Sequence, residues 1–276
     1  MARRPAVVPR RRDRLHRADD TLGRMSEHAP GPLALVGGDE LHPGNEDQDR
    51  RLVEAAGTGP AFVLATAAGR QRPELAVETA RSWFAGLGLA IEELPAVRRR
   101  DLTSPVVAAR AAEGRFFYLV GGDPGLVPAT LAGTPVWEAV LGAWRGGAAL
   151  AGSSAGAMAL GAWTLIRERR PGDARRRFRT ALGVVSRVAV VPHLDTFGRG
   201  WMTSVLDGAR EVDALPLGVD ERSAALWHDG GWRACGPGGV TVFGADGRER
   251  RFGAGDAIEG LPQPASRPAD RPGTPG

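Results

Sequence analysis

The sequence has no lysine and a single cysteine, and each shortage excludes a class of protein. All 36 basic residues are arginine, so the lysine-containing phosphate loop of P-loop NTPases is absent. The lone Cys235 excludes an internal disulfide framework and a cysteine-rich metal site. The first glycine-rich loop, Gly37-Gly38-Asp39, lacks the spacing of a dinucleotide site. No run approaches the roughly 20 apolar residues that span a bilayer. We therefore expect no metal, no cofactor and no membrane partner.

The net charge of +4 is concentrated near the N-terminus. Residues 1–30 hold eight arginines against four acidic residues, and this excess of four equals the whole net charge. The remaining chain is formally neutral. Arginine without lysine indicates a compositional bias rather than a phosphate-binding surface. Nucleic-acid binding is therefore not the primary interpretation, and a salt-dependent contact through residues 1–24 is kept only as an alternative.

Composition divides the chain into two tails and one folded part. Residues 1–30 are typical of a disordered, arginine-rich arm, in which Met25 is an alternative start of the protein. No apolar segment follows the paired arginines, as a secretory signal would require, so we expect a cytoplasmic protein. Residues 262–276 are rich in Pro, Arg and Gly and indicate a second disordered tail. Residues 31–261 are long enough to bury the core of one α/β domain.

Between the tails, short apolar runs alternate with segments of helical spacing. We expect strands at residues 33–36, 61–65, 91–94, 116–120 and 148–150, and helices at 46–56, 73–87, 104–113, 126–132 and 136–145. After residue 183 the pattern changes to short β runs at 188–191, 215–219, 224–227, 232–234 and 240–243. This pattern predicts an α/β fold of three layers, with a mostly parallel sheet, helices on both faces and a β-rich C-terminal edge. Glycine-rich loops at the carboxyl ends of the strands mark the expected ligand site.

One of these loops has the spacing of a nucleophile elbow. Gly152, Ser154 and Gly156 form a G-x-S-x-G pattern directly after an apolar run. The pattern predicts a strand, a sharp turn with Ser154 at its apex, and a helix over residues 157–165. A serine at such a turn has a strained backbone and needs small neighbours, because strand and helix pack closely there. The alternative is an ordinary turn of small residues.

A serine nucleophile needs a base, and the chain has five histidines. His16 and His28 lie in the arginine-rich arm, His42 lies in the first loop, and His228 precedes a tight turn. His193 lies at the end of a predicted strand downstream of the elbow and is the best-placed candidate. A purely structural role for a histidine at the end of a strand remains the alternative.

A carboxylate should orient the imidazole and stabilise its cation. Glu221 follows the next apolar strand and could reach the same edge of the sheet, with Asp220 and Asp195 as rivals. Because side chains alternate along a strand, Asp220 and Glu221 point to opposite faces and only one of them can serve.

Four motifs in this order resemble a known family. They are Phe117-Tyr118-Leu119-Val120-Gly121-Gly122-Asp123, Ala151-Gly152-Ser153-Ser154-Ala155-Gly156-Ala157, Pro192-His193 and Gly218-Val219-Asp220-Glu221. Together they are similar to the dipeptidase E and cyanophycinase family of serine peptidases, over roughly residues 33–252. The resemblance implies the class I glutamine amidotransferase-like fold, with serine in place of the amidotransferase cysteine.

The resemblance also implies roles for particular residues. Ser154 would be the nucleophile and His193 the general base, and Glu221 matches the acid of the cyanophycinase branch. The backbone N–H groups of Gly122 and Ala155 would form the oxyanion hole. The order serine, histidine, acid differs from that of α/β-hydrolases, in which the acid precedes the histidine. No metal or cofactor is needed for this chemistry.

Members of the resembled family cleave bonds next to aspartate. Dipeptidase E takes Asp-X dipeptides, and cyanophycinase cuts β-linked Asp-Arg. Pro192-His193 is closer to the dipeptidase E pattern, and Pro124 stands where cyanophycinases have glutamine. We expect a small, Asp-containing peptide as substrate. A cyanophycinase-type β-Asp-Arg hydrolase and a catalytically inactive ligand-binding member are alternatives, and a homodimer is left open.

Several residues near the motifs are candidates for contact with the substrate. Asp123, beside the oxyanion loop, could bind a substrate amine or could cap the next helix. Ser153, Asp195 and Arg199 are further candidates. The arginine-rich segment 167–179 could form a lid that binds an acidic substrate, or could be a solvated loop.

Overall fold

The computed structural model describes residues 30–167 and 176–265 of the chain. A seven-stranded sheet contains all five strands predicted in the first half of the chain, and its order is β11-β10-β1-β5-β4-β2-β3. Its strands are β1 (Leu33–Val36), β2 (Ala61–Leu64), β3 (Glu92–Glu93), β4 (Phe116–Leu119), β5 (Ala149–Ser153), β10 (Ala224–His228) and β11 (Gly231–Cys235). β1 to β5 are parallel, and the β10–β11 hairpin adds an antiparallel edge. Every residue of β1, β2, β4 and β5 is buried, as their continuous apolar runs predict.

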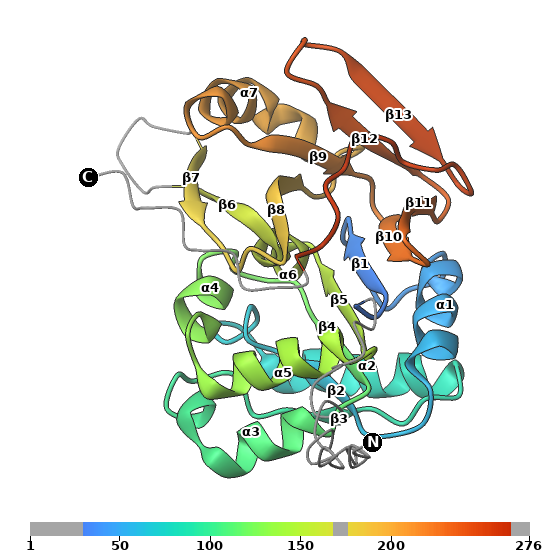
Figure 1. The fold of residues 1–276 in the computed structure, drawn as a ribbon, viewed down its shortest axis with the longest axis vertical. Helices are drawn as coiled ribbons and strands as arrows, with labels where there is room; N and C mark the ends of the chain where they lie inside the picture. The colour runs from blue at the N-terminus through green and yellow to red at the C-terminus, as the bar shows by residue number, and fades with distance from the viewer. Residues whose placement is uncertain (1–29, 168–175, 266–276) are drawn as a thin grey trace, which may run out of the picture.

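Helices cover both faces of this sheet (Figure 1). The helices of the described residues are α1 (Glu46–Ala56), α2 (Pro73–Gly86), α3 (Pro105–Ala112), α4 (Leu126–Leu131), α5 (Pro135–Arg145), α6 (Ala155–Leu160) and α7 (Met202–Glu211), with 3₁₀ turns at Asp101–Thr103 and Gly198–Trp201. Of these, α7 packs on a second sheet and not on this one. Alternate residues of β4 enter two different cores. Phe117 and Leu119 join the core beneath α3, α4 and α5, whereas Phe116 and Tyr118 join the core beneath α1 and α2.

Most strands after residue 160 form a second sheet, and only the β10–β11 hairpin extends the first as a β-rich C-terminal edge. The order of the second sheet is β13-β12-β9-β8-β6-β7, and Figure 1 shows it beside α7, at the end of the first sheet where β1 and β5 finish. Its strands are β6 (Gly161–Arg167), β7 (Arg176–Thr180), β8 (Val185–Val191), β9 (Leu215–Val219), β12 (Gly239–Phe243) and β13 (Glu249–Gly253). β6, β8 and β9 are parallel neighbours. The α/β class with mostly parallel strands is confirmed, but the strands are divided between two sheets.

The helix after the elbow is shorter than predicted. It begins at Ala155 and ends at Leu160, and the expected residues 161–165 belong to β6. The chain extends there because it pairs with β8, and the approach is close: a Cβ on Gly161 would lie 2.5 Å from the carbonyl oxygen of Val188. Sequence reasoning also missed α7, β7 and β13. Of the arginine-rich segment expected as a lid, residues 168–175 lie outside the described part, and Arg176–Thr180 is strand β7.

None of the helices among the described residues has the length and apolar character that crossing a membrane requires.

Candidate active site

Ser154 lies at the sharp turn between β5 and α6, at the carboxyl end of the central parallel strands. Its backbone has φ 49° and ψ −112°, a region that side-chain-bearing residues rarely adopt. The flanking glycines are required by close packing. A Cβ on Gly152 would lie 2.6 Å from the carbonyl carbon of Gly156, and one on Gly156 would lie 2.3 Å from the Leu119 oxygen. The structure therefore has the strained turn that the G-x-S-x-G spacing predicts.

His193 reaches Ser154 from the second sheet. It follows β8, and its Nε2 lies 3.0 Å from the Ser154 Oγ. The His193 N–H donates to the Gly37 oxygen at 2.7 Å, which anchors the residue to the loop after β1. The ring of Phe197 stacks on the imidazole with the centroids 4.5 Å apart. The imidazole is thus held between backbone and an aromatic ring.

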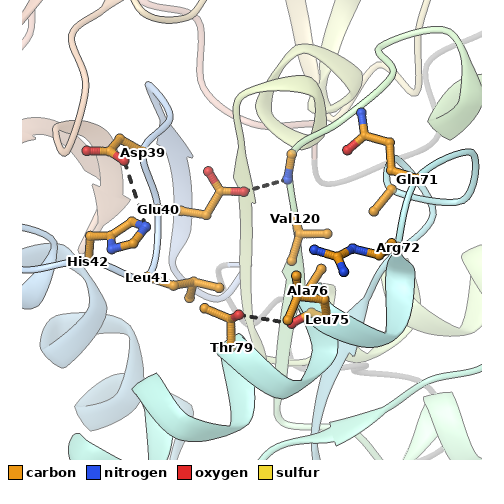
Figure 2. Close-up of a pocket in the computed structure, with 12 residues that line it drawn as sticks. Asp39, Glu40, Leu41, His42, Gln71, Arg72, Leu75, Ala76, Thr79 and Val120 are labelled. Atoms are coloured by element: carbon orange, nitrogen blue, oxygen red, sulfur yellow. Dashed lines mark hydrogen bonds and ion pairs between the residues drawn. The ribbon is translucent and has the colours of Figure 1, made fainter.

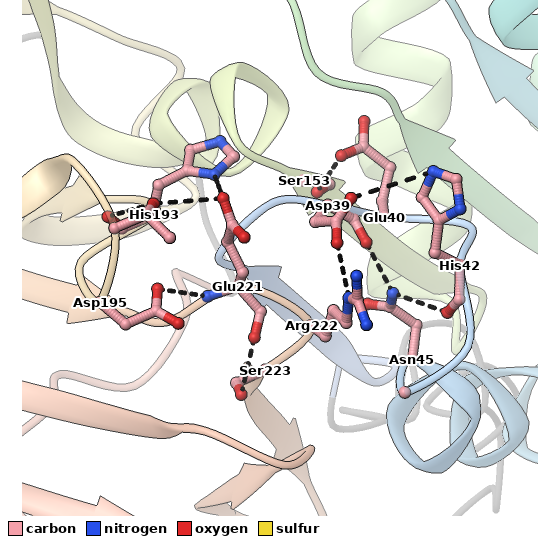
Figure 3. Close-up of polar contacts among 12 residues, drawn as sticks. Asp39, Glu40, His42, Asn45, Ser153, His193, Asp195, Glu221, Arg222 and Ser223 are labelled. Atoms are coloured by element: carbon pink, nitrogen blue, oxygen red, sulfur yellow. Dashed lines mark hydrogen bonds and ion pairs between the residues drawn. The ribbon is translucent and has the colours of Figure 1, made fainter.

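Glu221 lies on the other side of the imidazole (Figure 3). Its Oε1 is 2.8 Å from His193 Nδ1, and it also accepts a hydrogen bond from Thr196 Oγ1 at 3.2 Å. Because Nδ1 faces a carboxylate, we assign the ring proton to Nδ1. Nε2 is then free to accept the Ser154 proton. Serine, histidine and glutamate form one continuous hydrogen-bonded chain.

The two rival carboxylates have other partners. Asp220 is buried, and its Oδ2 accepts from the Gly239 N–H at 2.9 Å and pairs with Arg251. This orientation, away from His193, is what alternation along the strand predicts. Asp195 Oδ1 accepts from the backbone N–H of Glu221 at 3.0 Å (Figure 3). Asp195 therefore holds the Glu221 backbone and does not contact the imidazole.

The two predicted oxyanion donors flank Ser154. Ala155 is the first residue of α6, where a helix has N–H groups without partners inside the helix. Gly122 lies in the loop after β4 with φ 143°, and a Cβ there would be 2.3 Å from the Ala67 oxygen. Among the described residues, the Gly122 N–H has no protein acceptor. Gly122 and Ala155 therefore remain the predicted donors of an oxyanion hole.

The side chains that were expected to contact substrate bind other protein groups in the structure. Asp123 Oδ1 accepts from the Gly125 N–H at 2.8 Å, and its Oδ2 pairs with Arg70 at 2.8 Å. It therefore stabilises the turn before α4 rather than capping the helix, whose N-cap residue is Gly125. Arg199 pairs with Glu249 at 2.7 Å and is exposed, so its guanidinium is directed to β13. His42 is also exposed, 3.9 Å from Asp39.

Sequence reasoning missed Glu40, whose carboxylate lies beside the nucleophile. Glu40 Oε1 accepts from the Gly121 N–H at 2.7 Å, and Oε2 accepts from Ser153 Oγ at 2.9 Å. Ser153, expected to contact substrate, is fully buried and directed to this carboxylate. The available signal was the position of Glu40 in a Gly-Gly-Asp-Glu loop at the carboxyl end of β1, where ligand sites of parallel sheets lie.

A cavity of about 460 Å³ opens beside Glu40 (Figure 2). It lies between the loop after β1, the start of α2 and the end of β4, and its charged lining residues include Asp39, Glu40 and Arg72. Within the described residues, no cluster of three or more His, Cys, Asp or Glu side chains is placed to hold a metal ion. The cavity thus presents the charged side chains of Asp39 and Arg72 to an organic ligand bound beside Gly121.

One further acid lies beneath this region. Asp49 on α1 is buried and accepts from the indole N–H of Trp83 at 2.8 Å. Burial raises the pKa of the Asp49 carboxyl to about 7, opposed by the Trp83 hydrogen bond and assisted by the nearby charge of Glu40. Asp49 does not contact Ser154 and bears on stability instead.

A serine on a strained elbow, hydrogen-bonded to a histidine at the carboxyl ends of parallel strands, is the architecture of a serine hydrolase. The sequence model of peptidase family S51 matches residues 33–231, and the chain belongs to this family of serine peptidases. The resemblance to the dipeptidase E and cyanophycinase family is thereby confirmed.

Solved structures agree with this assignment. A peptidase from an acI-B1 Actinobacterium is 28% identical, with a TM-score of 0.74, and the match covers 84% of this chain and 98% of that one. A protein from Listeria monocytogenes EGD-e assigned as a peptidase E has the same fold, at 17% identity and a TM-score of 0.56, over 76% of this chain and 100% of that one. No curated protein sequence matches the chain.

Proposed function

We propose that this serine peptidase cleaves small, Asp-containing peptides through a triad of Ser154, His193 and Glu221. The observation that carries the proposal is the continuous chain of contacts, 3.0 Å from Ser154 Oγ to His193 Nε2 and 2.8 Å from Nδ1 to Glu221. Both distances are within the range for a nucleophile, its base and an orienting group. An inactive, ligand-binding member of the family would not need this arrangement.

The reaction follows the usual sequence of acyl transfer. Ser154 Oγ attacks the amide carbonyl carbon while His193 Nε2 takes the hydroxyl proton. Glu221 holds the imidazole in the correct tautomer and stabilises the imidazolium. His193 then gives the proton to the leaving amine, and the acyl group remains on Ser154. Water, deprotonated by His193, cleaves the acyl-enzyme and restores the hydroxyl.

The oxyanion that forms in each step needs fixed donors. We assign this role to the N–H groups of Gly122, in the loop after β4, and Ala155, the first residue of α6. A donor of this kind typically contributes about 3 kcal/mol to lowering the barrier. Because the donors are backbone groups, their geometry depends on how firmly the loops are held.

The substrate class follows from family membership rather than from a contact in the structure. Members of the resembled family act next to aspartate, either in Asp-X dipeptides or at β-linked Asp. The cavity beside Glu40 is large enough for one or two amino-acid residues, since about 460 Å³ lies in the range of small-ligand pockets. A small peptide therefore suits the space as well as the chemistry.

The test is hydrolysis of a panel of Asp-X, β-Asp-X and non-acidic dipeptides by the wild type and by Ser154→Ala. Ser82→Ala, on an exposed position of α2, is the matched control. We expect turnover of Asp-containing members by the wild type and the control, with loss in Ser154→Ala. Turnover confined to β-Asp-Arg would instead show a cyanophycinase-type enzyme. No turnover of any member would contradict the proposed substrate class.

A further inference from the structure

Glu40 connects two loops that are far apart in the sequence. Its Oε1 accepts a hydrogen bond from the Gly121 N–H at 2.7 Å, after β4, and its Oε2 accepts from Ser153 Oγ at 2.9 Å, at the end of β5. Figure 2 shows Glu40 directed to the β4 loop, and Figure 3 shows Glu40 with Ser153. No charged partner of Glu40 occurs among the described residues. Each of its two carboxylate oxygens accepts one of these two hydrogen bonds.

The strand order explains why this residue can join the two loops. β5 lies between β1 and β4 in the sheet. A side chain from the loop after β1 can therefore cross the carboxyl end of β5 and reach the loop after β4. These two loops carry the two candidate oxyanion donors, since Gly122 follows Gly121 and Ala155 lies two residues beyond Ser153. Glu40 therefore contacts Gly121, directly before the donor Gly122, and Ser153, two residues before the donor Ala155.

The loop after β4 needs such a contact because of its glycines. We call residues 121–123 the oxyanion loop. Gly121 and Gly122 can adopt many backbone conformations, and Gly122 has φ 143°. One end of the loop is fixed by the Asp123 N–H, which donates to the Ala67 oxygen at 2.8 Å. The hydrogen bond from Gly121 to Glu40 fixes the other end, so the peptide that carries the Gly122 N–H is held between two fixed points.

The spacing around Gly121 leaves little room for movement. A Cβ on Gly121 would lie 2.9 Å from Glu40 Oε1 and 3.2 Å from Ser154 Cβ. The oxyanion loop therefore passes directly between the carboxylate and the nucleophile. Loss of the carboxylate opens space on one side of the loop and removes the hydrogen bond that sets its orientation.

We propose that Glu40 is a positioning residue that fixes the two N–H donors of the oxyanion hole in position relative to each other. This inference rests on the proposed function of Gly122 and Ala155 as those donors. Glu40 acts through the loops and not on the substrate. It should therefore affect the transition state, in which the oxyanion exists, and leave binding of the uncleaved peptide unaffected.

The first test uses a fluorophosphonate, which phosphonylates a reactive serine and places a phosphoryl oxygen in the oxyanion hole. It needs no knowledge of the peptide substrate. We expect Glu40→Ala to slow inactivation roughly 10- to 100-fold. Glu40→Gln should stay within about 3-fold of the wild type, because its oxygen still accepts from Gly121 and its amide can donate to Ser153. Glu113→Gln, exposed at the end of α3 and at the opposite ends of the strands, is the charge-matched control.

Two outcomes would overturn the inference. One is equal inactivation rates for Glu40→Ala and the wild type. The other is a Glu40→Gln variant as slow as Glu40→Ala, which would show that the charge and not the geometry matters. If Glu40→Ala does not fold, as thermal unfolding would reveal, Ser153→Ala provides the second variant. It removes one of the two contacts, and we expect a smaller loss of about 3- to 10-fold, whereas an unchanged rate would count against the proposal.

A second readout uses any dipeptide that the wild type hydrolyses. Glu40→Ala should lower kcat by the factor seen with the fluorophosphonate and change KM less than about 3-fold. A change in KM alone would show that Glu40 binds substrate and would overturn the positioning role. If the fluorophosphonate labels Ser154 but no dipeptide is cleaved, the proposed substrate fails while the role of Glu40 is still tested by labelling.

Discussion

The backbone of Gly38 lies directly against the imidazole of His193. A Cβ built on Gly38 would be 2.2 Å from His193 Cε1 and 2.4 Å from Nε2. Gly38 follows β1 of the first sheet, whereas His193 follows β8 of the second. The candidate active site is therefore located where the two sheets meet, and the position of the base depends on a residue with no side chain.

Replacement of Gly38 by alanine should displace the imidazole. Alanine brings a Cβ into the ring and is strained at φ +113°. We expect kcat/KM to fall by roughly 100-fold or more, since small misplacements of a catalytic group are costly. Gly147→Ala is the matched control, because Gly147 has φ +104° with nothing within 4 Å. Steady-state kinetics of the two variants decide the matter, and similar activities would contradict the prediction.

The strained backbone at Ser154 should affect the free energy of unfolding of variants at this position. Glycine tolerates φ 49° and ψ −112° without the steric penalty that alanine has. We expect Ser154→Gly to be more stable than Ser154→Ala by about 1 kcal/mol, with both variants inactive. At Ser82, within α2, the order should be reversed, because glycine destabilises a helix relative to alanine by about 1 kcal/mol. Denaturant unfolding of the four variants measures both differences, and the same order at both sites would refute the explanation.

Glu221 and Asp220 are adjacent, yet their substitutions should have opposite effects. Glu221→Gln cannot stabilise the imidazolium, so we expect kcat to fall roughly 10²- to 10⁴-fold with little change in stability. Asp220→Asn weakens the pairing of a buried carboxylate with the half-exposed Arg251 and should cost about 1–3 kcal/mol of stability while retaining most of the activity. Kinetics and unfolding measurements on both variants test this. If only Asp220→Asn lost activity, the triad acid would be Asp220 and not Glu221.

Asp49 should make stability depend on pH. Its carboxyl has a pKa of about 7 in the folded protein, raised by burial from 3.8. Between these two values the folded state binds the proton and the unfolded state does not, so stability falls as pH rises from about 4 to 7. The loss is on the order of a few kcal/mol. Asp49→Asn, neutral at every pH and still able to accept from Trp83, should lose much less stability over this range. Unfolding curves at pH 4.5 and pH 8 measure the difference, and equal losses would contradict the assignment.

Local patterns were sufficient for much of the fold and for the candidates at the site. The alternation of apolar runs and helical spacing located the strands and helices of the first sheet, because periodicity reports which face of an element is buried. The G-x-S-x-G spacing selected Ser154, because close packing of strand and helix leaves no room for larger neighbours at Gly152 and Gly156. His193 was selected by its position after a strand. Alternation allowed only one of Asp220 and Glu221 to serve, and the family resemblance favoured Glu221.

Only the tertiary structure decided how these pieces meet. The division into two sheets and the extension of residues 161–167 into β6 depend on pairing with strands far along the chain. The contact of Glu40 with Gly121 and Ser153 exists because β5 separates β1 from β4 in the sheet. Strand order is set by long-range packing and leaves no local trace in the sequence. The candidate catalytic residues could thus be predicted from the sequence, whereas Glu40, which contacts the loops around them, could be identified only from the tertiary structure.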